Sequence, residues 1–121
     1  MAPPGMMQVA VDAIVFTIKN DKLNILLIKR KNAPFEGMHA LPGGFVLPEE
    51  SLEEGVRREL EEETNVKRIF LKQIGAYGNV DRDPRGRVLS VAYIALISAD
   101  QTLRATTDAV DAEWQSVYDL P

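Results

Sequence analysis

The sequence predicts a single α+β domain in which a mixed sheet packs against helical structure. Three observations support this prediction. The chain has 121 residues, which is enough for one hydrophobic core. Several segments of strand length are rich in β-branched and apolar residues. One amphipathic segment with helix-capping signals lies between them, and a helix inserted among strands indicates a layered architecture.

Five segments have the composition of strands, and turn residues or charged residues separate them. A polar turn at residues 20–22 divides the first two, and the charged, turn-rich residues 79–87 divide the third from the fourth. The predicted strands cover residues 8–18, 23–30, 69–77, 88–97 and 113–117.

Three further segments are not predicted to form regular structure. Residues 1–7 contain two prolines and a glycine and are expected to be a flexible leader, which leaves a domain of residues 8–121. Residues 31–40 form a predicted loop. Residues 41–46 are too short and too rich in glycine for a regular central strand. Their composition suits a tight backbone path beside a ligand.

The helix is expected to begin near Ser51. Ser51 and Glu54 have the spacing of a capping box, in which the hydroxyl caps an early amide and the carboxylate reaches back. Apolar residues recur every four positions and give the helix a buried stripe of Leu52, Val56 and Leu60.

Charge and composition exclude several classes of function. The net charge of −4 argues against non-specific nucleic-acid binding, which depends on basic surfaces. The chain has no cysteine, so disulfides and thiolate metal sites are excluded, as suits a cytoplasmic protein. We find neither a secretory signal nor an apolar segment long enough to cross a membrane.

The helix carries a cluster of acidic residues. Glu59, Glu62 and Glu63 are spaced i, i+3 and i+4, so their carboxylates emerge on one helix face and repel one another. A divalent cation would neutralise them, and oxygen ligands without nearby His or Cys select Mg²⁺ or Mn²⁺. Mg²⁺ often completes its coordination with a substrate's phosphates. The alternative is a solvated, glutamate-rich surface helix.

The segment from Gly44 to Val66 resembles the Nudix box, the signature of a family of pyrophosphohydrolases. The pattern G-x(5)-E-x(7)-R-E-U-x-E-E-x-G-U, with U an aliphatic residue, departs from this chain at one position, where Asn65 replaces glycine. Asn enters the left-handed conformation that ends many helices most easily after glycine. The matching residues are Gly44, Glu50, Arg58, Glu59, Leu60, Glu62, Glu63 and Val66.

The resemblance implies roles for these residues. Glu59, Glu62 and Glu63 are expected to bind the metal, with a backbone carbonyl of Gly43 as a further ligand. One glutamate, or a carboxylate from a loop, would serve as the base. Arg58 is expected to orient a carboxylate by a charge-assisted hydrogen bond. For Glu50 two roles stay open, namely an outer metal contact and a charge favoured by the helix dipole. The catalytic candidates are Arg58, Glu59 and Glu62.

The substrate candidates lie outside the helix. The cations at residues 29–31 and 82–87 could bind a diphosphate, and among them Arg30, Arg82 and Arg85 are the candidates. Gly44 would let the backbone approach the substrate. Phe35, in a loop, is the candidate for stacking on a base, while Trp114 and Tyr77 are alternatives for which core packing is the competing explanation. Asp108 and Asp111 are placed in a loop before the last strand, where some family members have an additional carboxylate. His39 is expected near the ligand.

Residues 29–46 and 81–93 resemble the ADP-ribose pyrophosphatases and the Nudix domains of ADP-ribose-sensing regulators of NAD metabolism. The first resemblance implies Mg²⁺-dependent hydrolysis of ADP-ribose to AMP and ribose 5-phosphate. The second implies ligand binding with little turnover. A nucleoside triphosphate pyrophosphohydrolase is a third reading. Regulators of this type commonly have a damaged box, so the complete set of charged residues in this box favours the enzyme.

The resemblance also implies a fold and an assembly. Nudix domains form an α/β/α sandwich, with helices on both sides of a mixed sheet. In the family a further helix normally follows the Trp-containing strand, and this chain stops at Pro121. We therefore expect a Nudix fold without that helix, or the front part of a longer protein. Relatives that hydrolyse ADP-ribose are often dimers, which makes a homodimer an expected assembly.

Overall fold

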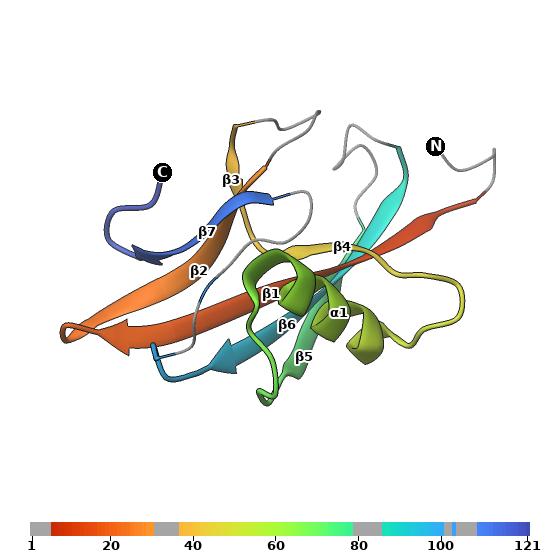
Figure 1. Ribbon diagram of the computed structural model, residues 1–121. Helices are drawn as coiled ribbons and strands as arrows, with labels where there is room; N and C mark the ends of the chain where they lie inside the picture. Colours follow the sequence, from red (N-terminus) through yellow and green to blue (C-terminus); the bar gives the residue numbers. More distant parts are fainter. Residues whose placement is uncertain (1–5, 31–36, 79–85, 101–102, 104–108) are drawn as a thin grey trace.

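The computed structural model describes residues 6–30, 37–78, 86–100, 103 and 109–121. One helix and seven strands lie in these residues, and the helix covers one face of the sheet (Figure 1). α1 is neither long nor apolar enough to cross a membrane, and no other helix occurs in the described part of the chain. The elements are β1 (Gln8–Lys19), β2 (Lys22–Arg30), β3 (His39–Ala40), β4 (Gly43–Phe45), α1 (Leu52–Thr64), β5 (Lys72–Tyr77), β6 (Val88–Leu96) and β7 (Ala109–Ser116).

The sheet is mixed, as predicted. Its main path runs β3-β2-β1-β6-β5, while β4 pairs with β1 and β7 pairs with β2. β1 and β6 are parallel along their length, and the other pairs are antiparallel. A parallel pair requires a long crossover connection, and the segment containing β2, β4 and α1 lies within that connection.

The glycine-rich segment is brought beside the helix because β1 changes partner along its length. The second half of β1 pairs with β2 up to the tight turn at Lys19 and Lys22. Its first half pairs instead with β4, where Val11 lies opposite Gly44. β2 continues away from β1 and pairs with β3 and β7. The strands thus form two groups, and β4 lies against α1.

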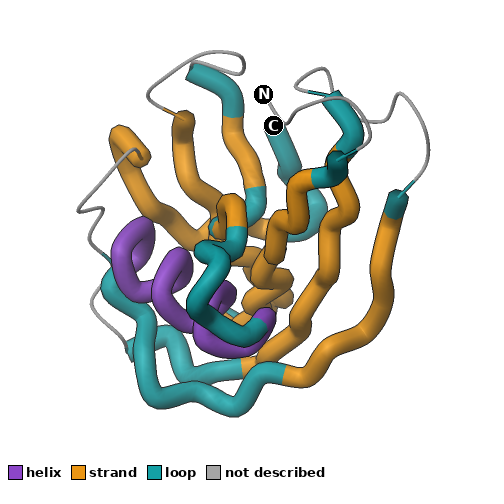
Figure 2. Tube along the Cα trace, turned by 90° about the vertical axis from the view of Figure 1, so that its right-hand side faces the viewer, coloured by secondary structure: helices purple, strands orange, loops and turns teal. Residues whose placement is uncertain are grey.

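The cap residues of α1 behave as predicted. Ser51 Oγ accepts a hydrogen bond from the Glu54 amide at 3.1 Å, and Glu54 Oε1 accepts one from the Ser51 amide at 2.8 Å. Asn65 ends the helix with φ of 68°, in the left-handed region where the family has glycine. The stripe residues Val56 and Leu60 are buried in the main core cluster. Figure 2 shows the helix along one side of the strands.

Four predicted boundaries need correction. The expected strand at residues 69–77 begins only at Lys72, because Ile69 and Leu71 pack on the core cluster beneath α1 without strand pairing, while Phe70 is exposed. The last strand begins at residue 109, so Asp111 lies in β7 opposite Lys29 and not in a loop. His39–Ala40, expected in a loop, form β3. Residues 43–45 pair with β1 as a short strand. Most of the expected leader, residues 1–5, lies outside the described residues.

Candidate functional site

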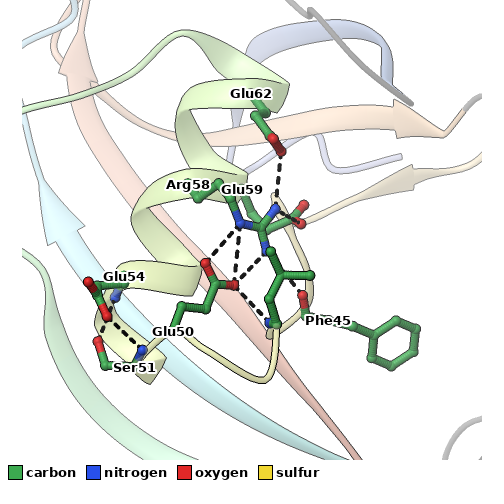
Figure 3. A network of polar contacts seen from close by, with 8 residues as sticks. Phe45, Glu50, Ser51, Glu54, Arg58, Glu59 and Glu62 are labelled. Atoms are coloured by element: carbon green, nitrogen blue, oxygen red, sulfur yellow. Dashed lines mark hydrogen bonds and ion pairs between the residues drawn. The ribbon is translucent and has the colours of Figure 1, made fainter.

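Arg58 is the centre of the polar contacts between α1 and the segment before it (Figure 3). Its Nη2 donates to Glu50 Oε1 at 2.7 Å, and its Nε donates to Glu50 Oε2 at 3.0 Å. Its Nη1 donates to Glu59 Oε1 at 2.7 Å and to Glu62 Oε1 at 3.1 Å. Its Nη2 also donates to the Phe45 carbonyl at 3.2 Å. The guanidinium therefore joins three carboxylates and β4.

These contacts change the acidity of the groups involved. The hydrogen bonds to Glu50 are the largest cause of a raised pKa for Arg58. The same contact lowers the pKa of Glu50, and a hydrogen bond from the Leu47 amide lowers it further. The pKa of Glu59 is raised, mainly because burial disfavours its charged form, although its contact with Arg58 opposes that effect. One guanidinium therefore acts on carboxylates whose pKa values shift in opposite directions.

Gly43 connects β4 to the end of the carboxylate cluster. Gly43 lies opposite Asp12 of β1. The neighbouring pair of residues, Ala13 and Pro42, is hydrogen-bonded, with the Ala13 amide donating to the Pro42 carbonyl at 2.8 Å. Because hydrogen-bonded and non-hydrogen-bonded pairs alternate in an antiparallel ladder, the amide and carbonyl of Gly43 point away from β1. Accordingly, the Gly43 amide donates to Glu63 Oε1 at 2.7 Å. A side chain is excluded here, because a Cβ on Gly43 would collide with the Val11 carbonyl oxygen.

Gly44 allows the strand to approach Glu59. A Cβ placed on Gly44 would lie 2.7 Å from Glu59 Oε2, closer than van der Waals contact allows. The glycine pair of β4 is therefore needed for two close approaches, one to the backbone of β1 and one to a carboxylate of α1. A tight backbone path was the prediction for this segment, and the structure supplies its physical reason.

The three clustered glutamates differ in exposure. Glu63 is buried, with 5% of its surface exposed. The side chain of Glu59 is 17% exposed, and that of Glu62 is 40% exposed. The α1 face that carries the cluster is thus partly covered by β4, unlike a solvated acidic surface.

The donor set suits a hard divalent cation in its chemistry. The three carboxylates supply only oxygen, and the register of Gly43 directs its carbonyl away from β1. Within the described residues, however, no three acidic or histidine side chains converge closely enough to enclose an ion as they stand. Arg58 contacts two of the carboxylates and the Gly43 amide contacts the third. A bound cation would have to compete with these contacts.

Glu50 has a contact that sequence reasoning missed. Its carboxylate binds Arg58 and the Leu47 amide, the latter at 2.9 Å, and its two expected roles stay predictions. Its side chain is 12% exposed. The two residues are eight positions apart across a helix start, so their contact depends on the path of the chain before Ser51, and no local sequence signal reports that path.

The other candidates fall into two groups. Arg30 lies at the end of β2 with its Nε buried and without a hydrogen-bond partner among the described residues. His39 contacts Glu113 of β7 at 2.9 Å, and Tyr77 is 53% exposed at the end of β5. Four candidates lie outside the described residues: Phe35, Arg82, Arg85 and Asp108.

For Trp114 the sequence offers two roles, stacking on a base and core packing. It packs against the main core, yet its indole Nε1 is buried without a hydrogen-bond partner in the described part of the chain. An unpartnered donor depends on tertiary packing, so the sequence carries no signal for it.

Comparison with known proteins identifies relatives of this arrangement. The family model described as NUDIX domain matches residues 6–121. An ADP-ribose pyrophosphatase of Methanocaldococcus jannaschii is 47% identical over 113 residues, which cover 93% of this chain and 64% of that protein. The ADPR responsive transcriptional repressor NtrR of Acinetobacter baylyi is 38% identical over 106 residues, covering 86% of this chain and 42% of the repressor.

Among solved structures, the NUDIX domain of Shewanella oneidensis NrtR complexed with ADP ribose superposes with a TM-score of 0.90. It is 36% identical, and the match covers 99% of this chain and 83% of that domain. The chain spans less than two thirds of the length of the two curated relatives.

Proposed function

This chain belongs to the NUDIX family, and we propose that it is a divalent-metal-dependent pyrophosphohydrolase that cleaves ADP-ribose to AMP and ribose 5-phosphate. The observation that carries the proposal is the set of three carboxylates on α1, joined to Arg58 and approached by the glycine strand β4. The 47% identity to an ADP-ribose pyrophosphatase supports the choice of substrate.

The chemistry adds one water to a diphosphate. A water oxygen attacks one phosphorus, the bond from that phosphorus to the bridging oxygen breaks, and the bridging oxygen leaves with the other phosphate. A glutamate of the cluster accepts the proton of the water. We assign Glu59, Glu62, Glu63 and the Gly43 carbonyl as the groups that would hold Mg²⁺ or Mn²⁺. When bound, such an ion neutralises phosphate charge and acidifies water.

We assign Arg58 the role of holding two of the cluster carboxylates in position. It holds Oε1 of Glu59 and of Glu62 at hydrogen-bond distance and is itself fixed by Glu50. Because Glu50 and the Phe45 carbonyl hold the other side of the guanidinium, Arg58 can orient the carboxylates without moving toward the substrate. Gly44 leaves Glu59 the space it needs beside β4.

A product assay tests this function. ADP-ribose, NADH, diadenosine polyphosphates and oxidised nucleoside triphosphates are each incubated with the protein and Mg²⁺. We expect the highest kcat/KM for ADP-ribose, with AMP and ribose 5-phosphate formed in equal amounts. Preferred turnover of a nucleoside triphosphate would overturn the substrate assignment.

A second candidate is an ADP-ribose sensor without turnover. The likeness to the ADP-ribose-bound domain of Shewanella oneidensis NrtR favours it. Calorimetric titration of ADP-ribose, run beside the product assay, separates the two. Tight binding with no product over many hours would establish the sensor and reject the hydrolase. The complete set of charged box residues is our reason for preferring the enzyme.

A further inference from the structure

The end of α1 and the segment that follows it line an open cavity of about 430 Å³. Residues 65–71 connect α1 to β5 (Figure 1). Four charged residues lie in the cavity wall: Arg57, Glu61, Lys67 and Arg68. The side chains of Glu61 and Lys67 are 54% and 50% exposed, so the cavity is open to solvent. Three cations and one carboxylate leave two positive charges in excess, in a chain whose net charge is −4.

This cavity lies on the side of α1 away from the carboxylate cluster. Arg57 and Glu61 are four residues apart and share one face of the helix. Successive residues of a helix are rotated by about 100°. Glu59 and Glu63 are each two residues from Glu61, or about 200° around the helix. A ligand in the cavity would therefore not occupy the site assigned to the metal.

Arg57 is held at the wall of the cavity by two hydrogen bonds. Its Nη1 donates to the Ile69 carbonyl at 2.7 Å, and its Nε donates to Glu53 Oε2 at 3.2 Å. The first bond ties the segment after the helix to α1. A guanidinium has five N–H donors, so Arg57 keeps donors beyond these two contacts. The position of its charge is thus set before any ligand arrives.

Arg68 differs from the other two cations in its contacts and its backbone. Among the described residues, Arg57 and Lys67 have acidic neighbours at 3.2 and 3.8 Å, and no ion pair is found for Arg68. Its φ is 61°, in the left-handed region. Gly and Asn enter this region most easily, and other L residues enter it at a cost in free energy. The backbone therefore does not explain an arginine here, and the exposed side chain is what requires a role.

Compensation of the helix dipole is the competing explanation for these cations. The C-terminal end of a helix carries about half a negative elementary charge. Near that end the Leu60 carbonyl accepts from Thr64 Oγ1 at 2.6 Å, and the Glu61 carbonyl accepts from the Asn65 amide at 2.9 Å. These carbonyls have donors of their own, and the excess positive charge in the cavity wall is larger than the dipole requires.

We propose that this cavity binds a sugar phosphate, at a site separate from the proposed function. Arg57 and Arg68 donate to the phosphate oxygens, for which a guanidinium is suited in charge and geometry. The Glu61 carboxylate accepts hydrogen bonds from sugar hydroxyls. The cavity volume is within the usual range of small-molecule sites, and inorganic phosphate alone would fill only part of it.

The test is calorimetric titration of ribose 5-phosphate, ribose and inorganic phosphate in EDTA, so that no divalent cation contributes. Ribose 5-phosphate should bind most tightly, inorganic phosphate more weakly and ribose not at all. Arg68→Asn removes the guanidinium and keeps a residue that accepts the left-handed conformation. We expect it to weaken ribose 5-phosphate binding about tenfold, because a charged hydrogen-bond partner is lost. Its Tm should be unchanged or higher, and its kcat/KM for ADP-ribose should be unchanged.

Two further variants make the test decisive. Lys67→Gln removes another cation of the wall without touching the backbone at Arg68, and it should also weaken ribose 5-phosphate binding. Lys22→Gln removes an exposed cation at the turn between β1 and β2 and should leave the affinity as it is. The proposal is overturned if the parent shows no saturable binding at millimolar ribose 5-phosphate. It is also overturned if Arg68→Asn and Lys67→Gln bind like the parent, or if Lys22→Gln weakens binding as much as they do.

Discussion

Replacing Gly44 by alanine tests whether β4 sets the position of a carboxylate. The backbone of Gly44 is not in the left-handed region, so alanine can adopt its conformation. The added methyl would lie 2.7 Å from Glu59 Oε2. Ordinary contact begins near 3.4 Å, so either the carboxylate or the strand must move by about 0.7 Å. Pairing with Val11 of β1 holds the strand, and we therefore expect the carboxylate to move.

The two consequences of this movement differ in size. The added methyl overpacks the site and should lower the free energy of unfolding by roughly 1 kcal/mol. This is at the low end for such changes, because the obstructing atom lies at the end of a flexible side chain. Moving Glu59 also disturbs its 2.7 Å contact with Arg58. Misplacement of a catalytic group by close to 1 Å can reduce turnover roughly 100-fold, or about 2.7 kcal/mol of activation free energy. Activity should thus fall much more than stability.

The assays are ADP-ribose hydrolysis with Mg²⁺ and denaturant unfolding, both with Gly75→Ala as the control. Gly75 lies in β5, and its nearest neighbour for a new methyl is the Tyr77 hydroxyl at 3.3 Å. In a Glu59→Ala background the stability cost of Gly44→Ala should disappear, which gives a coupling energy of about 1 kcal/mol. An equal cost in both backgrounds would refute the reasoning, because the methyl would then act on something other than Glu59.

Four further outcomes are expected. Excess EDTA should abolish hydrolysis, and activity that persists in chelator would remove the metal from the mechanism. Glu62→Gln should lower kcat/KM about a thousandfold, roughly 4 kcal/mol, with stability within about 0.5 kcal/mol; turnover equal to the parent would exclude Glu62 as a ligand. Glu50 has a lowered pKa, so its charge stabilises the fold above the ordinary value of 4.5 and that stabilisation is lost as pH falls through its pKa in the folded protein. The stability advantage of the parent over Glu50→Gln should accordingly be present at pH 7 and shrink in acid, and a difference independent of pH would contradict this assignment. Arg82→Ala should weaken ADP-ribose binding by about 1 to 3 kcal/mol, measured by calorimetry with Ca²⁺ in place of Mg²⁺, and unchanged affinity would show that Arg82 does not contact the ligand.

Local signals in the sequence were sufficient to predict the helix. Ser51 and Glu54 cap its start through contacts three residues apart, and Asn65 ends it with a backbone conformation that the residue itself favours. The bounds of the long strands β1 and β6 were also predictable to within one residue. Segments rich in β-branched residues with turn residues at their ends are a direct sequence signal for strands.

Contacts between distant segments could not be predicted in this way. Ile69 and Leu71 pack on the core near α1, and composition alone does not distinguish such packing from a strand. The polar sequence around Asp111 is typical of a loop, but Asp111 pairs with Lys29 of β2 in the sheet. Likewise, only the pairing of β2 with β7 places Arg30 and Trp114 on neighbouring strands.

The position of Arg58 also changes the argument for a metal. From the spacing alone, the clustered glutamates suit a divalent cation that would neutralise their mutual repulsion. In the structure Arg58 already supplies a positive charge to Glu59 and Glu62, and the Gly43 amide satisfies Glu63. Groups of the protein itself therefore offset the negative charge of the three glutamates, and a cation is required for the reaction more than for the stability of the fold. Chelation should consequently stop turnover while the thermal unfolding transition stays in place, and joint loss of both would show that the guanidinium does not offset the acidic charge.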